Sequence, residues 1–419
     1  MADPVTGKAL GKYLRSRAVA APWAIAGVSR SDFKALLVIP ALAEQEPLPL
    51  TLASLTRNAG DLLEQTLVVV VVNNHAAAAA VVKEENQQLL HWLQSCHRSG
   101  MNLAWVDAAS TGLELPAGEG VGLARKIGFD LGLEYLDWNN DPLLISLDAD
   151  TLVDENYLSA VFEHYAASKA AGAVIPFRHQ AASAPEQERA IRYYELYLRS
   201  YLFGLQVAGS PYAYHSIGSA LCCRGAAYVA AGGMNRRLAA EDFYFLQRLA
   251  KIDTVDFIFG TVVHPAPRYS ERVPFGTGRT LRQHVEDNRR GYRFIGKQAF
   301  ALLQRWLALV EENVDAPSGV VCQQAEKLSA EVAGYLAEVD FATVWAKQQH
   351  NHRSGRQRLR AFHDWFDALR TRQLLTRIDE SATAEPVEVV AELLAWGNCS
   401  VPATLIDQLQ LLERLQGVE

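Results

Sequence analysis

Short apolar runs alternate with stretches of helical spacing over roughly the first 150 residues. The runs at 35–40, 66–72 and 142–147 are rich in branched residues and show no alternation of apolar and polar positions. Strands that are buried on both faces have this pattern, which is typical of parallel sheets. Strands are predicted at 35–40, 66–72, 101–106 and 142–147, and helices at 48–58, 76–96 and 121–135. This order predicts a doubly wound α/β sheet.

The pattern changes after the predicted sheet. Residues 151 to about 270 mix helical and strand-like pieces, and from about 280 the chain is mostly helical and charged, as at 323–340 and 361–378. We therefore expect a lead-in at 1–33, an α/β domain at 34–280 and a helical accessory region at 281–419. The lead-in is basic and has no apolar core of a signal peptide, so it predicts a short docking helix. The helical region could serve as the surface of a homodimer.

Composition narrows the class of protein. The formal net charge of −7 argues against a nucleic-acid binder. No stretch of 18 or more residues is apolar and free of charge, so no membrane-spanning helix is expected. The five cysteines form no CxxC pair, which favours reduced thiols and a cytoplasmic location over a zinc site or a disulfide framework.

Polar residues follow three of the predicted strands. They lie at 41–44, at Asn73 and Asn74, and at 148–150. Ligands of doubly wound sheets bind at the carboxyl ends of the strands. We therefore expect these three segments to meet at one edge of the sheet.

Asp148 and Asp150 are candidate metal ligands. In an extended backbone residues i and i+2 point to the same side, so both carboxylates can face one point. Hard oxygen ligands of this kind suit Mg²⁺ or Mn²⁺ that bridges to a diphosphate. A solvated turn is the alternative interpretation. His264 follows a predicted strand and is either a third ligand or a structural histidine.

Two acidic residues, Glu241 and Asp242, follow a Gly232–Gly233 turn and begin an apolar helical run. They either complement the helix macrodipole or supply a general base. Further along, Arg268, Arg272 and Arg279 surround a glycine-rich stretch. That segment is either a loop that closes over phosphate oxygens or an ordinary solvated loop.

With these motifs in order, residues 34 to 270 resemble the family 2 glycosyltransferases of the GT-A fold. The segment from Val38 to Glu44 resembles the family's first strand and loop, and 120–128 resembles its Gly-x-x-x-Ala-Arg-Asn-x-Gly segment. The Asp-x-Asp motif at 148–150 and the Gly-Gly…Glu-Asp motif at 232–242 complete the match. The resemblance implies a metal-dependent transferase that moves a sugar from a nucleotide-diphosphate sugar to an acceptor hydroxyl.

The resemblance also implies roles for individual residues. Asp148 and Asp150 would hold Mn²⁺ or Mg²⁺, with His264 as a third ligand. Asp242 would be the base of an inverting transfer, supported by Glu241. The donor would contact a wider set: Pro40, Ala41, Glu44, Asn73, Asn74, Arg125, Asp148, Arg268 and Arg279.

The sequence departs from the family where the donor base would bind. The family usually has Asp-Asp-Gly-Ser after the second strand, and this chain has Asn73-Asn74-His75. A nucleotide-sugar sensor or assembly protein without activity is one alternative. A sugar nucleotidyltransferase is a weaker one, because its glycine-rich loop after the first strand is missing.

Overall fold

The structure is a computed structural model that describes residues 7–96, 100–268, 292–381 and 384–418. The chain divides into two compact units. The first contains the described residues up to Ile191, those from Ser216 to Arg268, and Gly417 and Val418. The second contains 192–215 and the described residues from Tyr292 to Gln416. Residues 7–33 thus share a unit with the sheet, and part of the long helix α7 (Pro185–Val207) belongs to the helical unit.

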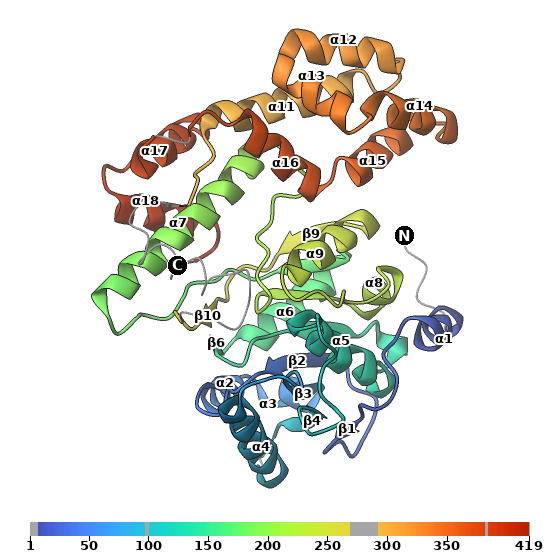
Figure 1. The fold of residues 1–419 in the computed structure, drawn as a ribbon, viewed down its shortest axis with the longest axis vertical. Helices are drawn as coiled ribbons and strands as arrows, with labels where there is room; N and C mark the ends of the chain where they lie inside the picture. The colour runs from blue at the N-terminus through green and yellow to red at the C-terminus, as the bar shows by residue number, and fades with distance from the viewer. Residues whose placement is uncertain (1–6, 97–99, 269–291, 382–383, 419) are drawn as a thin grey trace. The chain divides into compact units, whose positions relative to one another are not determined.

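The first unit contains an eight-stranded mixed sheet (Figure 1). Its spatial order is β1-β4-β3-β2-β5-β8-β7-β9. The strands are β1 (Ile25–Ala26), β2 (Ala35–Ala41), β3 (Thr66–Asn73), β4 (Asn102–Ala108), β5 (Leu143–Ser146), β7 (Gly172–Val174), β8 (Leu221–Arg224) and β9 (Val255–Phe257). A separate antiparallel pair joins β6 (Thr151–Val153) to β10 (Val263–Pro265).

The four strands β4, β3, β2 and β5 run parallel to one another. β2 and β3 are buried along their whole length, as their uninterrupted apolar runs predicted. β8 is antiparallel to both β5 and β7, which makes the sheet mixed. The predicted class, a doubly wound α/β sheet followed by a helical segment, is confirmed.

Helices connect the strands of the first unit. They are α1 (Gly7–Ser16), α2 (Pro47–Leu55), α3 (Gly60–Glu64), α4 (Ala80–Ser95), α5 (Val121–Gly132), α6 (Tyr157–Ala167), α8 (Gly225–Ala230) and α9 (Glu241–Ile252), with 3₁₀ turns η1 (Leu133–Tyr135) and η2 (Trp138–Asn140). α5 lies very close to β2 and β3, because a Cβ at Gly128 would overlap Val38 and lie 2.9 Å from Val71 Cγ2. This close approach holds the first half of α5 near the carboxyl edge of the sheet.

The predicted docking helix is α1, and it is tied to α5 and α8 through Asp130. Tyr13 and Tyr228 each donate to Asp130 Oδ1 at 2.7 Å. The Val19 amide donates to Asp130 Oδ2 at 2.8 Å, and Lys126 forms an ion pair with the same oxygen at 2.8 Å. The Asp130 side chain is fully buried, so this network replaces its lost hydration.

The second unit is helical. Besides the later part of α7 it contains α11 (Lys297–Glu312), α12 (Ser318–Leu328), α13 (Ala330–Glu338), α14 (Phe341–Asn351), α15 (Gly355–Trp365), α16 (Ala368–Ile378), α17 (Pro386–Trp396) and α18 (Leu405–Leu415). Its core includes the fully buried Trp306, Trp345 and Phe362. The helical stretches at 323–340 and 361–378 are each interrupted, because Ser329 caps α13 and Asp367 caps α16 with their side chains. No helix among the described residues is long and apolar enough to cross a membrane.

Candidate active site at the carboxyl edge of the sheet

The three predicted segments follow strands that end at the same edge of the sheet. Glu44 follows β2, Asn73 ends β3 and Asn74 follows it, and Asp148 and Asp150 follow β5. Because β8 is antiparallel to β5, with Leu221 paired to Ser146, the segment that precedes β8 comes to this edge as well. α9 begins at Glu241, and the buried Arg125 of α5 joins that residue to Asp148.

Arg125 bonds to groups from three parts of the chain. Its Nη2 donates to Asp148 Oδ1 at 2.7 Å, and its Nε donates to Glu241 Oε1 at 3.1 Å. Its Nη1 donates to Ser146 Oγ at 2.9 Å and to the Gly218 carbonyl at 3.3 Å. Arg125 is only 2% exposed, so its donors are used within the protein. These bonds position Asp148 and Glu241 relative to each other, and the contact of Arg125 with the donor stays a prediction.

One glycine leaves space for Arg125, and a second lets α5 approach the loop before α9. A Cβ at Gly218 would overlap the guanidinium of Arg125. A Cβ at Gly122 would lie 2.6 Å from the Arg237 carbonyl and 3.0 Å from Glu241 Cβ. The start of α5 therefore packs directly against the loop before α9, which brings the Asp-x-Asp and Glu-Asp motifs to one guanidinium.

Burial changes the protonation of the acidic residues around Arg125. Burial and the nearby Asp242 raise the pKa of Glu241 to about 8, against the opposing effect of Arg125. Burial also raises the pKa of Asp242 to about 6, and it raises the pKa of Asp148 above its usual range. One guanidinium cannot neutralise all of these carboxylates, so the cluster retains protons at neutral pH. Of the two residues that begin α9, Asp242 has the lower pKa.

Asp242 is also better placed than Glu241 to act as a base. Glu241 is 4% exposed and its carboxylate accepts from Arg125. Asp242 is less deeply buried, and its Oδ1 accepts from the Phe243 amide at 2.7 Å. This hydrogen bond orients the carboxylate at the first turn of α9, where the helix dipole favours its negative charge.

Asp150 contacts a second arginine. Arg268 Nη2 donates to Asp150 Oδ2 at 2.6 Å and to Glu44 Oε2 at 2.7 Å. Arg268 thus links Glu44 to the Asp-x-Asp motif by hydrogen bonds to both carboxylates. The predicted loop arginines Arg272 and Arg279 lie outside the described residues.

The third predicted metal ligand is not grouped with the two carboxylates. His264 Nε2 lies 3.0 Å from Asp154 Oδ1, and its Nδ1 lies 3.2 Å from the Arg178 carbonyl. Within the described residues, no three His, Cys, Asp or Glu side chains form a group that could hold a metal ion. Asp148 and Asp150 still fit Mg²⁺ or Mn²⁺, because such ions are commonly bound by one or two carboxylates together with substrate phosphates.

The side-chain amides of Asn73 and Asn74, at the end of β3, form hydrogen bonds with neighbouring segments. Asn73 Nδ2 donates to the Ala41 carbonyl at 3.0 Å, and Asn74 accepts from Asn86 at 2.8 Å. Asn86 also accepts from the Ala43 amide at 2.9 Å, and Ala43 has a positive φ of 52°. Asn73 and Asn74 are 5% and 2% exposed. They therefore shape the predicted donor pocket, and their roles as direct donor ligands stay a prediction.

Pro40 and Ala41 are buried in β2, the Ala41 carbonyl accepts from Asn73, and the contacts of both residues with the donor stay a prediction. The sequence did not single out Asn86 or Gly218, although both hold site residues in place. Asn86 is one polar residue among many in α4, and Gly218 lies in an apolar, glycine-containing stretch. Neither has a local pattern that would mark it.

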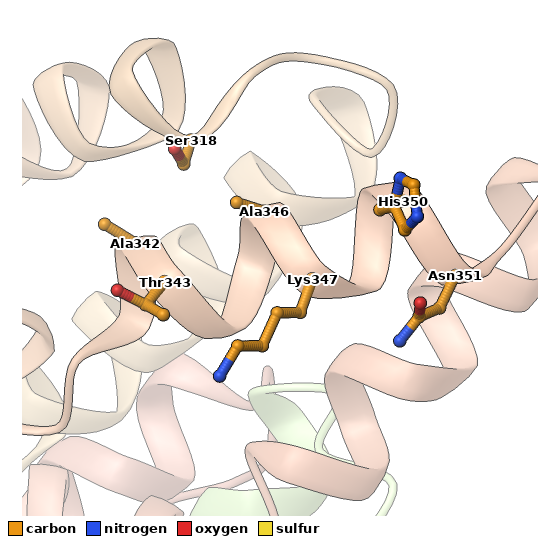
Figure 2. A pocket seen from close by; sticks show the side chains of 7 residues that line it. All are labelled: Ser318, Ala342, Thr343, Ala346, Lys347, His350 and Asn351. Carbon is orange, nitrogen blue, oxygen red and sulfur yellow. The ribbon is translucent and has the colours of Figure 1, made fainter.

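A hollow of about 560 Å³ lies in the helical unit, and no predicted site residue lines it. Figure 2 shows its lining: Ser318 begins α12, and Thr343, Lys347, His350 and Asn351 come from α14. The hollow is shallow, and small or solvent-facing residues make up most of its lining. It offers none of the clustered carboxylates that the sheet edge provides.

No protein-family model matches the chain, and no curated protein matches it. Among solved structures, residues 1–349 of TarS from S. aureus in complex with UDP-GlcNAc are similar, at 10% identity and a TM-score of 0.36, over 92% of this chain and 88% of that one. The mannosyltransferase PcManGT from Pyrobaculum calidifontis in complex with GDP-Man and Mn²⁺ is similar at 15% identity and a TM-score of 0.37, over 86% and 95%. A likeness of this degree does not establish function, which depends on the side chains at the sheet edge.

Proposed function

We propose that the chain is a metal-dependent glycosyltransferase that moves a sugar from a nucleotide-diphosphate sugar to an acceptor hydroxyl. The observation that supports this most directly is Arg125, which bonds to both Asp148 and Glu241. The carboxylate of Asp148 and the start of α9, which carries Asp242, are thereby joined by the buried guanidinium of Arg125. Two acidic motifs that are about ninety residues apart in the sequence form one site.

In this proposal Asp242 is the general base. It accepts the proton of the acceptor hydroxyl as that oxygen forms a bond to the anomeric carbon, and the bond from that carbon to the diphosphate oxygen breaks. The pKa of Asp242, raised to about 6, matches this role because the group is ionised at pH 7 but still basic. We propose an inverting outcome, since the hydroxyl attacks in a single displacement.

Glu241 and Arg125 support the reaction without taking the proton. Arg125 orients Asp148 through one hydrogen bond, and Glu241 accepts another from Nε of the same guanidinium. Asp148 and Asp150 are the residues that would hold the divalent cation. When bound, such a cation neutralises the charge that develops on the departing diphosphate.

A catalytic test follows the release of nucleoside diphosphate. Purified full-length protein is incubated with UDP-, GDP-, ADP- and dTDP-sugars, with Mn²⁺, Mg²⁺ or EDTA, and the products are measured by mass spectrometry. We expect slow, metal-dependent hydrolysis of one donor class, and a greatly reduced rate in Asp242→Asn. Hydrolysis that is equally fast in Asp242→Asn would exclude Asp242 as the base.

A nucleotide-sugar binding protein without activity is the second candidate. The buried amides of Asn73 and Asn74, which bond to the loops, are the observation in its favour. Such a protein would bind one donor and release no nucleoside diphosphate from any of them.

A further inference from the structure

The guanidinium of Arg268 bonds to two carboxylates at the edge of the sheet. Its Nε and Nη2 both donate to Asp150 Oδ2, at 3.0 and 2.6 Å, and Nη2 also donates to Glu44 Oε2 at 2.7 Å. The Arg268 side chain is 39% exposed, whereas Glu44 and Asp150 are 13% and 22% exposed. Arg268 thus places a positive charge next to Glu44 and Asp150, which are both partly exposed to solvent.

The backbone beside Arg268 is fixed by the sheet. β10 pairs with β6, and the pairing continues when the Ala266 amide donates to the Asp150 carbonyl at 3.1 Å. On the other side of β10, Gln180 Nε2 donates to the carbonyls of His264 and Asp150, at 2.7 and 3.1 Å. The main chain at Asp150 and next to Arg268 is therefore held in place, and the part of the contact that is exposed to solvent is the arginine side chain.

Both bonds from Arg268 to Asp150 end on the same oxygen. A divalent cation on that oxygen would lie roughly 2.1 Å away, as is usual for carboxylate ligands of Mg²⁺. A guanidinium that keeps both hydrogen bonds would compete for the same lone pairs and repel the cation. Arg268 and a cation on Asp150 Oδ2 therefore exclude each other.

We propose that Arg268 is a positioning residue that holds Asp150 until a divalent cation replaces it there. This inference rests on the proposed function. The guanidinium orients Asp150 and Glu44 and limits their repulsion while no cation is bound. Once released, its planar fork suits a diphosphate as well as it suits a carboxylate. The same side chain would then serve the carboxylates before donor binding and the donor afterwards.

The exchange predicts how Mn²⁺ binds when no nucleotide is present. Binding is measured on the full-length protein by electron paramagnetic resonance of free Mn²⁺, for wild type and Arg268→Ala. We expect Arg268→Ala to bind Mn²⁺ at least threefold more tightly, because its intramolecular competitor is gone. Arg377→Ala is the control, since Arg377 is 36% exposed and pairs with Glu338 far along the chain in the helical unit; its Mn²⁺ affinity should equal that of wild type.

Two further variants make the comparison secure. Arg268→Lys keeps the charge but not the fork, so its Mn²⁺ affinity should lie between those of wild type and Arg268→Ala, and circular dichroism confirms that each variant is folded. Asp150→Asn should lose most Mn²⁺ binding in either background. When UDP or GDP is added, the advantage of Arg268→Ala should shrink, because the arginine then contacts the diphosphate.

The outcomes separate this inference from the proposed function. Equal or weaker Mn²⁺ binding by Arg268→Ala overturns the exchange; if wild type still releases nucleoside diphosphate from a donor, the proposed function stands. Mn²⁺ binding that does not respond to Asp150→Asn places the cation elsewhere and also overturns the exchange. No Mn²⁺ binding by any of these proteins, with or without UDP or GDP, contradicts both proposals.

Discussion

Replacing Arg125 with methionine tests directly how much the buried guanidinium stabilises the fold. Methionine is similar in length but removes the charge and all four hydrogen bonds to Asp148, Glu241, Ser146 and the Gly218 carbonyl. Removing one partner of a buried ion pair costs about 3–5 kcal/mol of folding stability when the remaining charge stays ionised. We therefore expect Arg125→Met to lose about 3 kcal/mol at pH 8.

The loss of folding stability in Arg125→Met should be larger at pH 8 than at pH 5.5. Burial raises the pKa of Glu241 from 4.5 to about 8, so between these values the native protein binds more protons than the unfolded chain. Its contribution to stability is thus present below pH 4.5 and is lost as pH rises through 8. Arg125 lowers the pKa of Glu241, so without it the pKa rises further and the loss continues to higher pH. At pH 5.5 Glu241, with a pKa of about 8, is largely protonated, and Arg125→Met should lose less, with about 1 kcal/mol as the hydrogen-bond part.

Thermal unfolding at pH 5.5 and pH 8 measures this difference. For a domain of this size about 3 kcal/mol corresponds to roughly 6–12 °C in Tm. Arg377→Met is the matched control, because it breaks an exposed ion pair with Glu338 and should change stability by less than about 1 kcal/mol. A Tm change for Arg125→Met that matches the control, or that is the same at both pH values, would refute the electrostatic coupling of the two motifs.

Further predictions concern the base, its pH dependence and the anchor of α1. Asp242→Asn should lower transfer by about 10²–10⁴-fold in steady-state assays while donor binding persists, whereas Glu241→Gln should retain most activity because glutamine can still accept from Arg125. Wild-type activity should fall about tenfold per pH unit below pH 6, where Asp242 becomes protonated, and a flat profile down to pH 5 would argue against it. Asp130→Ala should lose about 3 kcal/mol in urea unfolding, because Lys126 and Tyr13 lose a buried partner, and Tyr13→Phe should lose about 1 kcal/mol; equal losses would contradict the network.

The strands that carry the site could be predicted because their signal is local. β2, β3 and β5 are continuous apolar runs that need burial on both faces, and each ends at a polar residue or a loop. The convergence of Glu44, Asp148 and Asp150 at one edge then follows from the parallel order. Glu241 and Asp242 could be recognised as a motif, but the sequence could not predict how close they lie to the edge of the sheet.

The contacts among side chains could not be predicted, because they depend on pairs that are distant in the sequence. Arg125 is 116 residues from Glu241 and 93 from Gly218, and no local pattern distinguishes a buried arginine from one that binds phosphate. His264 is expected from the sequence to follow a strand but lies within β10, where its Nε2 is 3.0 Å from Asp154 Oδ1, a contact that no local pattern indicates. The hydrogen bond from the Asn73 amide to the Ala41 carbonyl at the end of β2 likewise has no local signal in the sequence.

The most direct test of the central claim is a thermal-shift panel of UDP-, GDP-, ADP- and dTDP-sugars with and without Mn²⁺, on wild type and Asp150→Asn. A ligand at a hundredfold excess over its Kd stabilises the native state by about 2.7 kcal/mol. The account predicts that one donor class raises the Tm of wild type in the presence of Mn²⁺, and that this shift is lost in Asp150→Asn. A panel without any shift, or a shift that persists unchanged in Asp150→Asn, would contradict a nucleotide-sugar site at the Asp148–Asp150 edge of the sheet.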